Sequence, residues 1–517
     1  MRAKQLLVSA VLLTVWMTNV TGGVMNGTSL RAECEKSESC RATSRHYARL
    51  VSGAAPAGAE LALFANMLPK GGDLHHHYTG AIYAETFLEW VKAQNYCIYT
   101  ENVKVGDQSK QKYHIETKPE VLPVELRPLC ISADEVMKRK DNEKSFYRGL
   151  LMRWSDKDYD NHSHEQNPPD QQFFEAFGYF GPVAGYSFRD GLKALKERAI
   201  TENLQYLETQ LKGAPTVDNK ELAPGLNALS ADSPDDKVDA ALTAYADFMD
   251  RDSSSQGKIK DYVKLHQDAA AGLDDARFKV RFQSYIARNA APAVVFSGLY
   301  SAYVAARTAP DLIVGVNIVS QENGEVSMRD YGLHMKMFRF LNKRFPGVKL
   351  SLHAGELVLG MVPPEGLRSH IREAVEVAGA RRIGHGVDIA HEADALGLLD
   401  KMREEAVAIE INLTSNAFIL GVKAEDHPVQ LYRKYKVPFV ISTDDAGISR
   451  NNLSGEYALF MSRYKPGYAE LKETVYNSIR YSFLSEREKT SELRGLQKRF
   501  AEFEKRVAEN IRMANVH

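Results

Sequence analysis

The sequence predicts an α/β fold of the (β/α)8 TIM-barrel type, with an N-terminal helical extension and inserted segments. Short apolar segments alternate with amphipathic helical stretches along most of the chain, and this alternation is typical of parallel strands. Eight such segments can be counted, which favours a closed barrel over an open doubly wound sheet. No glycine-rich phosphate-binding turn follows the first of them, which argues further against a dinucleotide-binding fold.

The composition is that of a folded globular protein. The chain has 517 residues, 44% of them hydrophobic, and its 66 Lys and Arg residues nearly balance its 67 Asp and Glu residues. The formal net charge of −1 gives no global basic field. Nucleic acid is therefore not an expected partner.

The first 23 residues have the pattern of a secretory signal peptide. Arg2 and Lys4 precede an apolar run at 6–20, and small residues follow at 21–23. The run is shorter than the roughly 20 apolar residues that a membrane span requires, which favours cleavage over a retained anchor. We expect an exported protein, periplasmic or secreted, with no membrane segment after cleavage.

Four cysteines lie in the first part of the chain, an even number in a compartment expected to be oxidising. Three pairings are possible. We expect the local one, Cys34 with Cys40 and Cys97 with Cys130, because the second pair brackets one inserted segment; free buried thiols are the alternative. The cysteine spacing does not match a metal-binding motif, so no catalytic role is assigned to them.

The predicted elements follow one another in a simple order. Residues 24–66 form a helical extension, with apolar residues at helical spacing in 44–51 and 60–67. A barrel domain follows at 67–517, interrupted by a hairpin-like insertion at about 96–130 and by an elaborated connection at 212–260. The predicted strands are 73–77, 204–207, 280–286, 312–319, 348–353, 382–385, 407–413 and 439–442.

Metal-ligand residues recur at the ends of these strands. His75 and His77 are two residues apart on the first strand, so both side chains point to one face of it. His353 ends a later strand and Asp444 follows the last one, where barrel enzymes build their sites. An isolated His-x-His pair is usually structural, but three imidazoles and a carboxylate together fit a zinc site.

Three further polar residues follow strands of the same barrel. Glu356, His385 and Asp445 are candidates for proton transfer and substrate orientation. Taken singly, Glu356 could cap a helix, His385 could fill the core and Asp445 could close a turn. Their recurrence at the carboxyl ends of strands favours a functional role.

Five motifs, in one order, carry a resemblance to a known family. They are Met-Leu-Pro-Lys at 67–70 leading into His-His-His at 75–77, Ser-Leu-His-Ala-Gly-Glu at 351–356, Arg-Ile-Gly-His-Gly at 382–386, Leu-Thr-Ser-Asn at 413–416 and Ser-Thr-Asp-Asp at 442–445. In these motifs the chain resembles the adenosine deaminases, a zinc-dependent branch of the amidohydrolase superfamily, and in particular their secreted members. The resemblance extends over most of the chain, from about Met67 to Ile448.

The resemblance implies a mechanism as well as a fold. It implies that one Zn²⁺ per chain is bound by the four ligands above and that Glu356 donates a proton to the purine N1. It implies that His385 orients or deprotonates the attacking water and that Asp445 hydrogen-bonds the purine N7. The implied reaction converts adenosine or 2′-deoxyadenosine to the inosine compound plus ammonia, so the implied partner is a small-molecule purine nucleoside.

Two departures from the family concern the substrate end. Thr79 stands where the family commonly has an acidic residue that contacts the sugar, and Ser320 stands where it often has a glycine near the purine. Together with Asp445 and His77, these two are the substrate-binding candidates. The preferred amino-purine therefore stays open, with AMP and adenine as alternatives.

The alternative to an enzyme is a secreted growth-factor-like binding protein that has the same barrel. The intact metal and proton-transfer set argues against a function of binding alone. A homodimer formed through the N-terminal helices or the insertion is compatible with the sequence, which gives no direct evidence for it.

Overall fold

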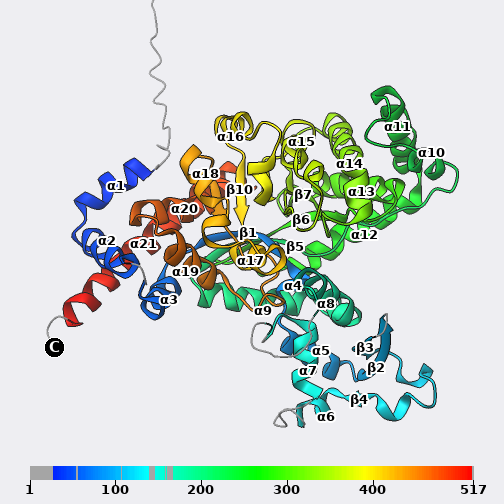
Figure 1. The fold of residues 1–517 in the computed structure, drawn as a ribbon, viewed down its shortest axis with the longest axis horizontal. Coiled ribbons are helices and arrows are strands. Elements are labelled where there is room, and N and C mark those ends of the chain that lie inside the picture. Colours follow the sequence, from blue (N-terminus) through cyan, green and yellow to red (C-terminus); the bar gives the residue numbers. More distant parts are fainter. Residues whose placement is uncertain are drawn as a thin grey trace, which may run out of the picture.

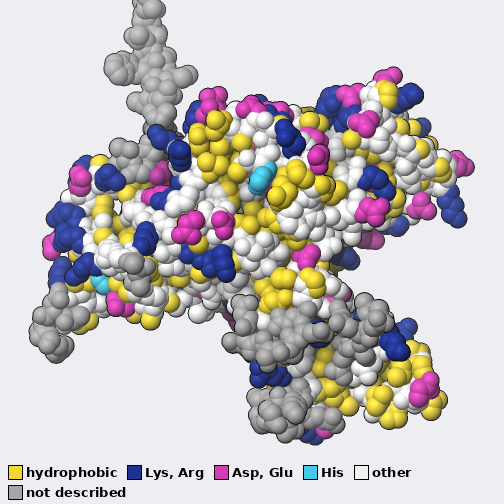
Figure 2. Space-filling view, in the orientation of Figure 1, with side chains coloured by type: hydrophobic (Ala, Val, Ile, Leu, Met, Phe, Trp, Pro, Cys, Tyr) yellow, Lys and Arg dark blue, Asp and Glu magenta, His cyan; other side chains and the backbone are white. Residues whose placement is uncertain are grey.

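The computed structural model describes residues 27–53, 56–105, 108–138, 146–157, 159 and 167–514. The predicted signal peptide at 1–23 lies outside the described residues. Within the described residues, no helix is both long enough and apolar enough to cross a bilayer. Basic and acidic side chains are interspersed over the visible face of the protein (Figure 2), in keeping with the near-zero net charge.

All eight predicted strands form, and they are parallel. Four pair in the order β1-β5-β6-β7 and four in the order β8-β9-β10-β11. Two isolated parallel bridges, Val316 with Leu350 and His76 with Asp444, join the two groups and close the ring. The predicted TIM-type barrel is confirmed (Figure 1). Its strands are β1 Gly71–His77, β5 Leu204–Gln210, β6 Lys279–Ala287, β7 Ile313–Val319, β8 Ser351–Ala354, β9 Arg382–His385, β10 Ala408–Ile411 and β11 Phe439–Ile441.

The strands are buried along their length because helices cover the outside of the barrel while side chains fill its inside. Every residue of β5, β7, β8, β9, β10 and β11 is buried, as is typical of parallel strands. Several of these strands nevertheless carry polar residues, among them Glu208, Asn317 and Glu410. Buried polar groups require partners, and these three lie close to the site described below.

Helices connect the strands and cover the barrel. The connection predicted at 212–260 is largely helical, and it includes α10, α11 and the first part of α12. The connecting helices are α4 Tyr78–Ala81, α5 Ala84–Ala93, α6 Ala133–Lys138, α7 Phe146–Trp154, α8 Pro169–Ala184, α9 Phe188–Thr201, α10 Ala223–Asn227, α11 Asp235–Arg251, α12 Ser253–Ala270, α13 Pro292–Thr308, α14 Glu325–Arg344, α15 His370–Glu376, α16 Ala395–Glu404, α17 Leu413–Leu420, α18 Val429–Tyr435, α19 Leu453–Tyr464 and α20 Tyr468–Arg480.

The N-terminal extension packs on the other end of the chain. It consists of α1 Gly27–Lys36, α2 Glu38–Val51 and α3 Gly58–Met67, and Figure 1 shows α2 beside the last helix, α21 Glu486–Ala514. The Thr43 hydroxyl on α2 donates to the Glu504 carbonyl on α21 at 3.2 Å. The extension is therefore tied to the barrel through the C-terminal helix.

The insertion after α5 is a small antiparallel sheet that projects from the barrel (Figure 1). Its strands are β2 Cys97–Val105, β3 Gln108–Glu116 and β4 Ile131–Ser132, so the sheet continues slightly beyond the predicted limit of 130. Disulfides join Cys34 to Cys40 and Cys97 to Cys130. Both predicted pairings are confirmed, and the second one closes the insertion.

Candidate active site

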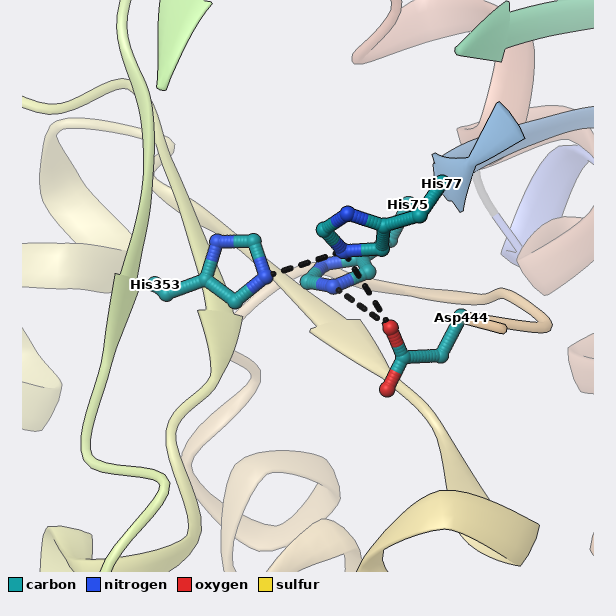
Figure 3. Close-up of side chains that lie close together, drawn as sticks. All are labelled: His75, His77, His353 and Asp444. Carbon is teal, nitrogen blue, oxygen red and sulfur yellow. Dashed lines mark hydrogen bonds and ion pairs between the residues drawn. The ribbon is translucent and has the colours of Figure 1, made fainter. Parts of the chain in front are cut away.

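The four predicted metal ligands converge at the carboxyl end of the barrel (Figure 3). His75 and His77 come from β1, His353 comes from β8, and Asp444 follows β11. The Nε2 atom of His77 lies 3.2 Å from Nε2 of His353 and 3.3 Å from Oδ1 of Asp444. The Nε2 atom of His75 lies 3.4 Å from the same oxygen. One ligand atom from each of the four lies within 4.8 Å of the others.

This arrangement fits zinc. Ligands about 2.0–2.2 Å from a tetrahedral zinc lie about 3.3–3.6 Å from one another, which matches the three short separations. The Nε2 atom of His75 is buried and has no hydrogen-bond partner, as expected for a nitrogen whose lone pair binds a cation. The residues therefore form a site for one zinc ion.

The outer nitrogens of two ligands are held by buried acceptors. Nδ1 of His75 donates to Glu410 Oε2 at 2.8 Å, and Nδ1 of His353 donates to Asn317 Oδ1 at 2.9 Å. Because each Nδ1 atom faces an acceptor, the ring proton lies on Nδ1, and the lone pair of Nε2 is free to bind the metal. The third polar partner is Ser415, whose hydroxyl donates to Asp444 Oδ2 at 2.6 Å.

Glu410 is in turn held by a buried cation. Its Oε1 accepts from Arg382 Nε at 2.5 Å and from Ser351 Oγ at 2.8 Å, and Arg382 also donates to Glu208. Burial alone would raise the pKa of Glu410, but Arg382 and His75 hold that pKa at about 2. The carboxylate behind His75 therefore stays ionised.

The backbone is strained where the strands end. Ser320, His385 and Asp444 have φ values of 85°, 70° and 61°, a region that costs a non-glycine residue on the order of 1–3 kcal/mol. The strain falls on three of the predicted site residues. Ser320 thus keeps a backbone conformation that glycine adopts freely.

Glu356 and His385 face each other beside the metal ligands. Nε2 of His385 lies 3.6 Å from Glu356 Oε1 and 3.9 Å from Asp444 Oδ2. The Asn416 amide donates to Nδ1 of His385 at 2.9 Å, which assigns the proton of the neutral ring to Nε2. Burial lowers the pKa of His385 to about 3.

The carboxyl group of Glu356 retains its proton more readily than an ordinary carboxylic acid. Burial, reinforced by the nearby Asp444 carboxylate, raises the pKa of Glu356 well above its usual range. The Glu356 residue is 8% exposed, and it lines the cavity described below. It can therefore hold a proton at neutral pH and present it to a bound ligand.

Asp445 presents an unpartnered oxygen to the same cavity. The residue is buried, and its Oδ1 has no hydrogen-bond partner. A Cβ atom at Gly80 would lie 1.6 Å from that oxygen, so only glycine fits beside it. Burial, and then the adjacent Asp444, raises the pKa of Asp445 well above its usual range.

A cavity of about 530 Å³ opens above these residues, within the range typical of small-molecule sites. The candidates at the substrate end, Thr79 and Ser320, also line it. The lining also includes three phenylalanines, several amides and a phenol. These lining residues, which the sequence analysis missed, are Phe173, Phe174 and Phe177 of α8, with Gln210, Tyr285, Asn289 and Gln321.

Gln210 is the most informative of the missed residues. It ends β5, pairs with His77 in the strand register and is 2% exposed. Both atoms of its side-chain amide lack a hydrogen-bond partner. An amide at the carboxyl end of a predicted barrel strand, where such barrels build their sites, was the signal that could have found it.

Comparisons with known proteins agree with this geometry. Residues 253–499 match the family model described as adenosine deaminase. An adenosine deaminase of Clostridium perfringens is 32% identical over 175 residues, which cover 33% of this chain and 48% of the relative. One of Mycobacteroides abscessus is 26% identical over 274 residues, covering 51% and 64%. The chain thus spans about half to two thirds of the length of these curated relatives.

Solved structures share the fold at low identity. An amidohydrolase from Burkholderia ambifaria with bound Zn has a TM-score of 0.50 and 18% identity, covering 87% of this chain and 94% of its own. The N6-methyl-AMP deaminase of Arabidopsis thaliana has a TM-score of 0.52 and 16% identity, covering 84% and 98%. An adenine deaminase from Arthrobacter aurescens has a TM-score of 0.51 and 16% identity, covering 83% and 98%.

The barrel and the ligand set together define a TIM-type barrel with a site for one zinc ion. Within it, the segment at 253–499 and the curated relatives point to one family more narrowly. Residues 253–499, just under half of the chain, match the adenosine deaminase family.

Glu410→Gln tests how the metal ligands are held. The neutral amide loses the charge that pairs with Arg382 and weakens the acceptor behind His75, so zinc affinity should fall about 10- to 100-fold. Zinc content after dialysis against graded chelator measures this. Glu405→Gln is the matched control, because Glu405 pairs with Lys401 on the exposed surface. Equal zinc retention in both variants would contradict the role of Glu410.

Proposed function

We propose that this chain is a zinc-dependent hydrolytic deaminase of adenine-containing small molecules, with adenosine and 2′-deoxyadenosine as preferred substrates. The products are inosine or 2′-deoxyinosine and ammonia. The observation that carries the proposal is the buried acid Glu356, which faces His385 beside the four zinc ligands in one cavity. The curated relatives, which are adenosine deaminases, support the nucleoside.

Each residue of the site has a place in this reaction. Bound zinc supplies Lewis acidity, which makes water a competent nucleophile at neutral pH. Glu356 gives its proton to the purine N1 and so makes C6 electrophilic. His385, through Nε2, orients the attacking water and stabilises the charge that develops on its oxygen. As the C6–O bond forms, the water gives up two protons: one restores the Glu356 carboxyl group and the other moves to N6. The C6–N6 bond then breaks and ammonia leaves.

The rest of the cavity suits a nucleoside. The Oδ1 atom of Asp445 is available to hydrogen-bond the purine N7, and the phenylalanines of α8 offer an apolar wall to a flat ring. Apart from the zinc ligands, Glu356, His385 and Asp445, the described lining of the cavity is built of neutral groups, including Thr79, Gln210 and Asn289. Phosphate binding typically uses arginine or lysine, so this lining favours a nucleoside over AMP.

Glu356→Gln tests the proposal directly. The amide keeps the shape of the side chain but has no acidic proton to give to N1, so turnover should fall about 10²- to 10⁴-fold with zinc retained. Ammonia release is measured on adenosine, 2′-deoxyadenosine, AMP, N6-methyl-AMP and adenine, with zinc quantified in the same samples. Glu365→Gln, an exposed acid in the loop after β8, is the matched control.

The panel separates the possible outcomes. Near-normal turnover by Glu356→Gln would remove the proposed proton donor. Turnover of AMP or adenine in preference to the nucleosides would keep the deaminase and change its substrate. Full zinc occupancy with no turnover on any of the five compounds would overturn the deaminase itself.

Gln210→Met tests the substrate end. If the unpartnered amide hydrogen-bonds the substrate, its loss should raise KM about 2- to 10-fold per bond and leave kcat nearly unchanged, since one such bond contributes about 0.5–1.5 kcal/mol. Steady-state kinetics on adenosine measure the split. Gln430→Met, an exposed glutamine on α18, is the control. An unaltered KM would exclude Gln210 from substrate contact.

We also propose that the protein is exported. Two disulfides favour an oxidising compartment, and residues 1–23 have the composition of a signal peptide. Expression in the native host should yield a mature chain whose amino terminus falls near residue 22 or 23, which mass spectrometry of the secreted or periplasmic fraction measures. A chain retaining Met1 in the cytosol would contradict export.

A further inference from the structure

A buried carboxylate outside the predicted site holds the peptide that carries Glu356. Glu322 lies between β7 and α14 and is 1% exposed. Its two oxygens accept from consecutive backbone N–H groups, Gly355 at 3.0 Å and Glu356 at 2.9 Å. One carboxylate that accepts two adjacent N–H groups fixes both the position and the tilt of the peptide.

Two cationic or polar partners hold Glu322 in turn. The Nη1 atom of Arg288 lies 3.7 Å from its Oε2, and both side chains are fully buried. Nδ1 of His370 donates to its Oε1 at 2.6 Å. The His370 ring stacks on Tyr331 with centroids 3.6 Å apart and an interplanar angle of 2°, and the Tyr331 hydroxyl donates to the His370 carbonyl at 2.7 Å.

The same peptide is held from its other side. Gly355 has a φ of 74°, and its carbonyl accepts from the backbone N–H of Val387 at 2.7 Å. A Cβ atom at Gly355 would lie 2.4 Å from Asp388 Oδ1, so the loop has no room to shift in that direction. Because Glu322 holds the N–H groups on one side and Val387 contacts the carbonyl on the other, the backbone of this loop is fixed, and only the Glu356 side chain can still rotate.

Arg288 also reaches the metal side of the site. Its Nη2 donates to the carbonyl of His353 at 3.2 Å. The guanidinium therefore lies between the strand that presents a zinc ligand and the carboxylate that holds the Glu356 peptide. Arg288 and Glu322 thus link the strand of His353 to the peptide of Glu356, and neither of them lines the cavity.

We propose that Glu322, held by Arg288 and His370, is a positioning residue that fixes the Glu356 carboxyl group for proton transfer. This inference rests on the proposed deaminase function. Its physical basis is that a proton donor misplaced by about 1 Å can cost about 10²-fold in rate. Substrate binding, which uses other residues, should depend on Glu322 far less.

Glu322→Gln is the first test. Its amide retains one acceptor but turns an NH₂ group toward a backbone N–H, so the peptide loses one of its two anchors. We expect kcat on adenosine to fall about 10- to 100-fold, with KM changed less than about 2-fold and zinc content unchanged. Glu325→Gln, an exposed acid three residues away, is the control. A Glu322→Gln enzyme with wild-type kcat, or with KM raised as much as kcat falls, overturns the proposal.

A double-mutant cycle separates positioning from a general structural effect. If Glu322 acts through Glu356, adding Glu322→Gln to Glu356→Gln should leave the residual turnover nearly unchanged. An equal loss in both backgrounds would overturn the proposal. His370→Phe, which keeps the stack on Tyr331 but removes the donor to Glu322, provides a second variant should Glu322→Gln fail to fold. It should lower kcat in the same direction by a smaller factor, and a normal kcat in this variant would count against the proposal.

These results are distinguishable from failure of the proposed function. No turnover by the unmodified protein on any amino-purine would remove the deaminase and the positioning role with it. Turnover by the unmodified protein with no kcat effect of Glu322→Gln would remove the positioning role alone.

Discussion

The pairing of Arg382 with two carboxylates inside the barrel is the interaction on which the metal site depends. A lone carboxylate at the position of Glu410 would take up a proton in this buried setting, and it would then be a poorer acceptor behind His75. Arg382 on β9 meets Glu410 on β10 and Glu208 on β5, and its guanidinium lies 3.8 Å above the Phe483 ring. One fully buried cation therefore keeps charge at the base of the site, where the ligand His75 is oriented.

A second buried pair serves the proton donor in the same way. Arg288 and Glu322 lie beneath the loop that carries Glu356, while Arg382 and Glu410 lie beneath His75. Removing either arginine would leave a buried carboxylate without its cation, which is strongly destabilising. Two separate ion pairs therefore support the site: one orients the metal ligand His75, and the other holds the loop that carries Glu356. The contact of Arg288 with the His353 carbonyl connects the second pair to a metal ligand.

Features that depend on local sequence patterns could be predicted from the sequence, whereas contacts between residues far apart in the chain could not. The strands follow from short apolar segments that alternate with helices, and the shared face of His75 and His77 follows from their two-residue spacing. Both disulfides follow from pairing of cysteines that are close in sequence. Glu322, by contrast, meets a peptide 34 positions away in the loop after β8, and spacing alone does not predict such a contact. A charged residue within an otherwise apolar strand, as at Glu410, was the available sign that a buried partner must exist.

The matched segment carries most of the proposed reaction, whereas the substrate end is shared between matched and unmatched sequence. The family match at 253–499 contains His353, Glu356, His385, Asp444 and Asp445, which include the proposed proton donor and half of the zinc ligands. Thr79, Gln210 and the phenylalanines of α8 lie before it, Asn289 and Ser320 lie within it, and all of them line the same cavity. Because the proposed substrate is distinguished from other amino-purines by groups remote from C6, its choice depends in part on residues that the family match does not cover. A reaction common to the family and a substrate particular to this chain are therefore compatible within one barrel.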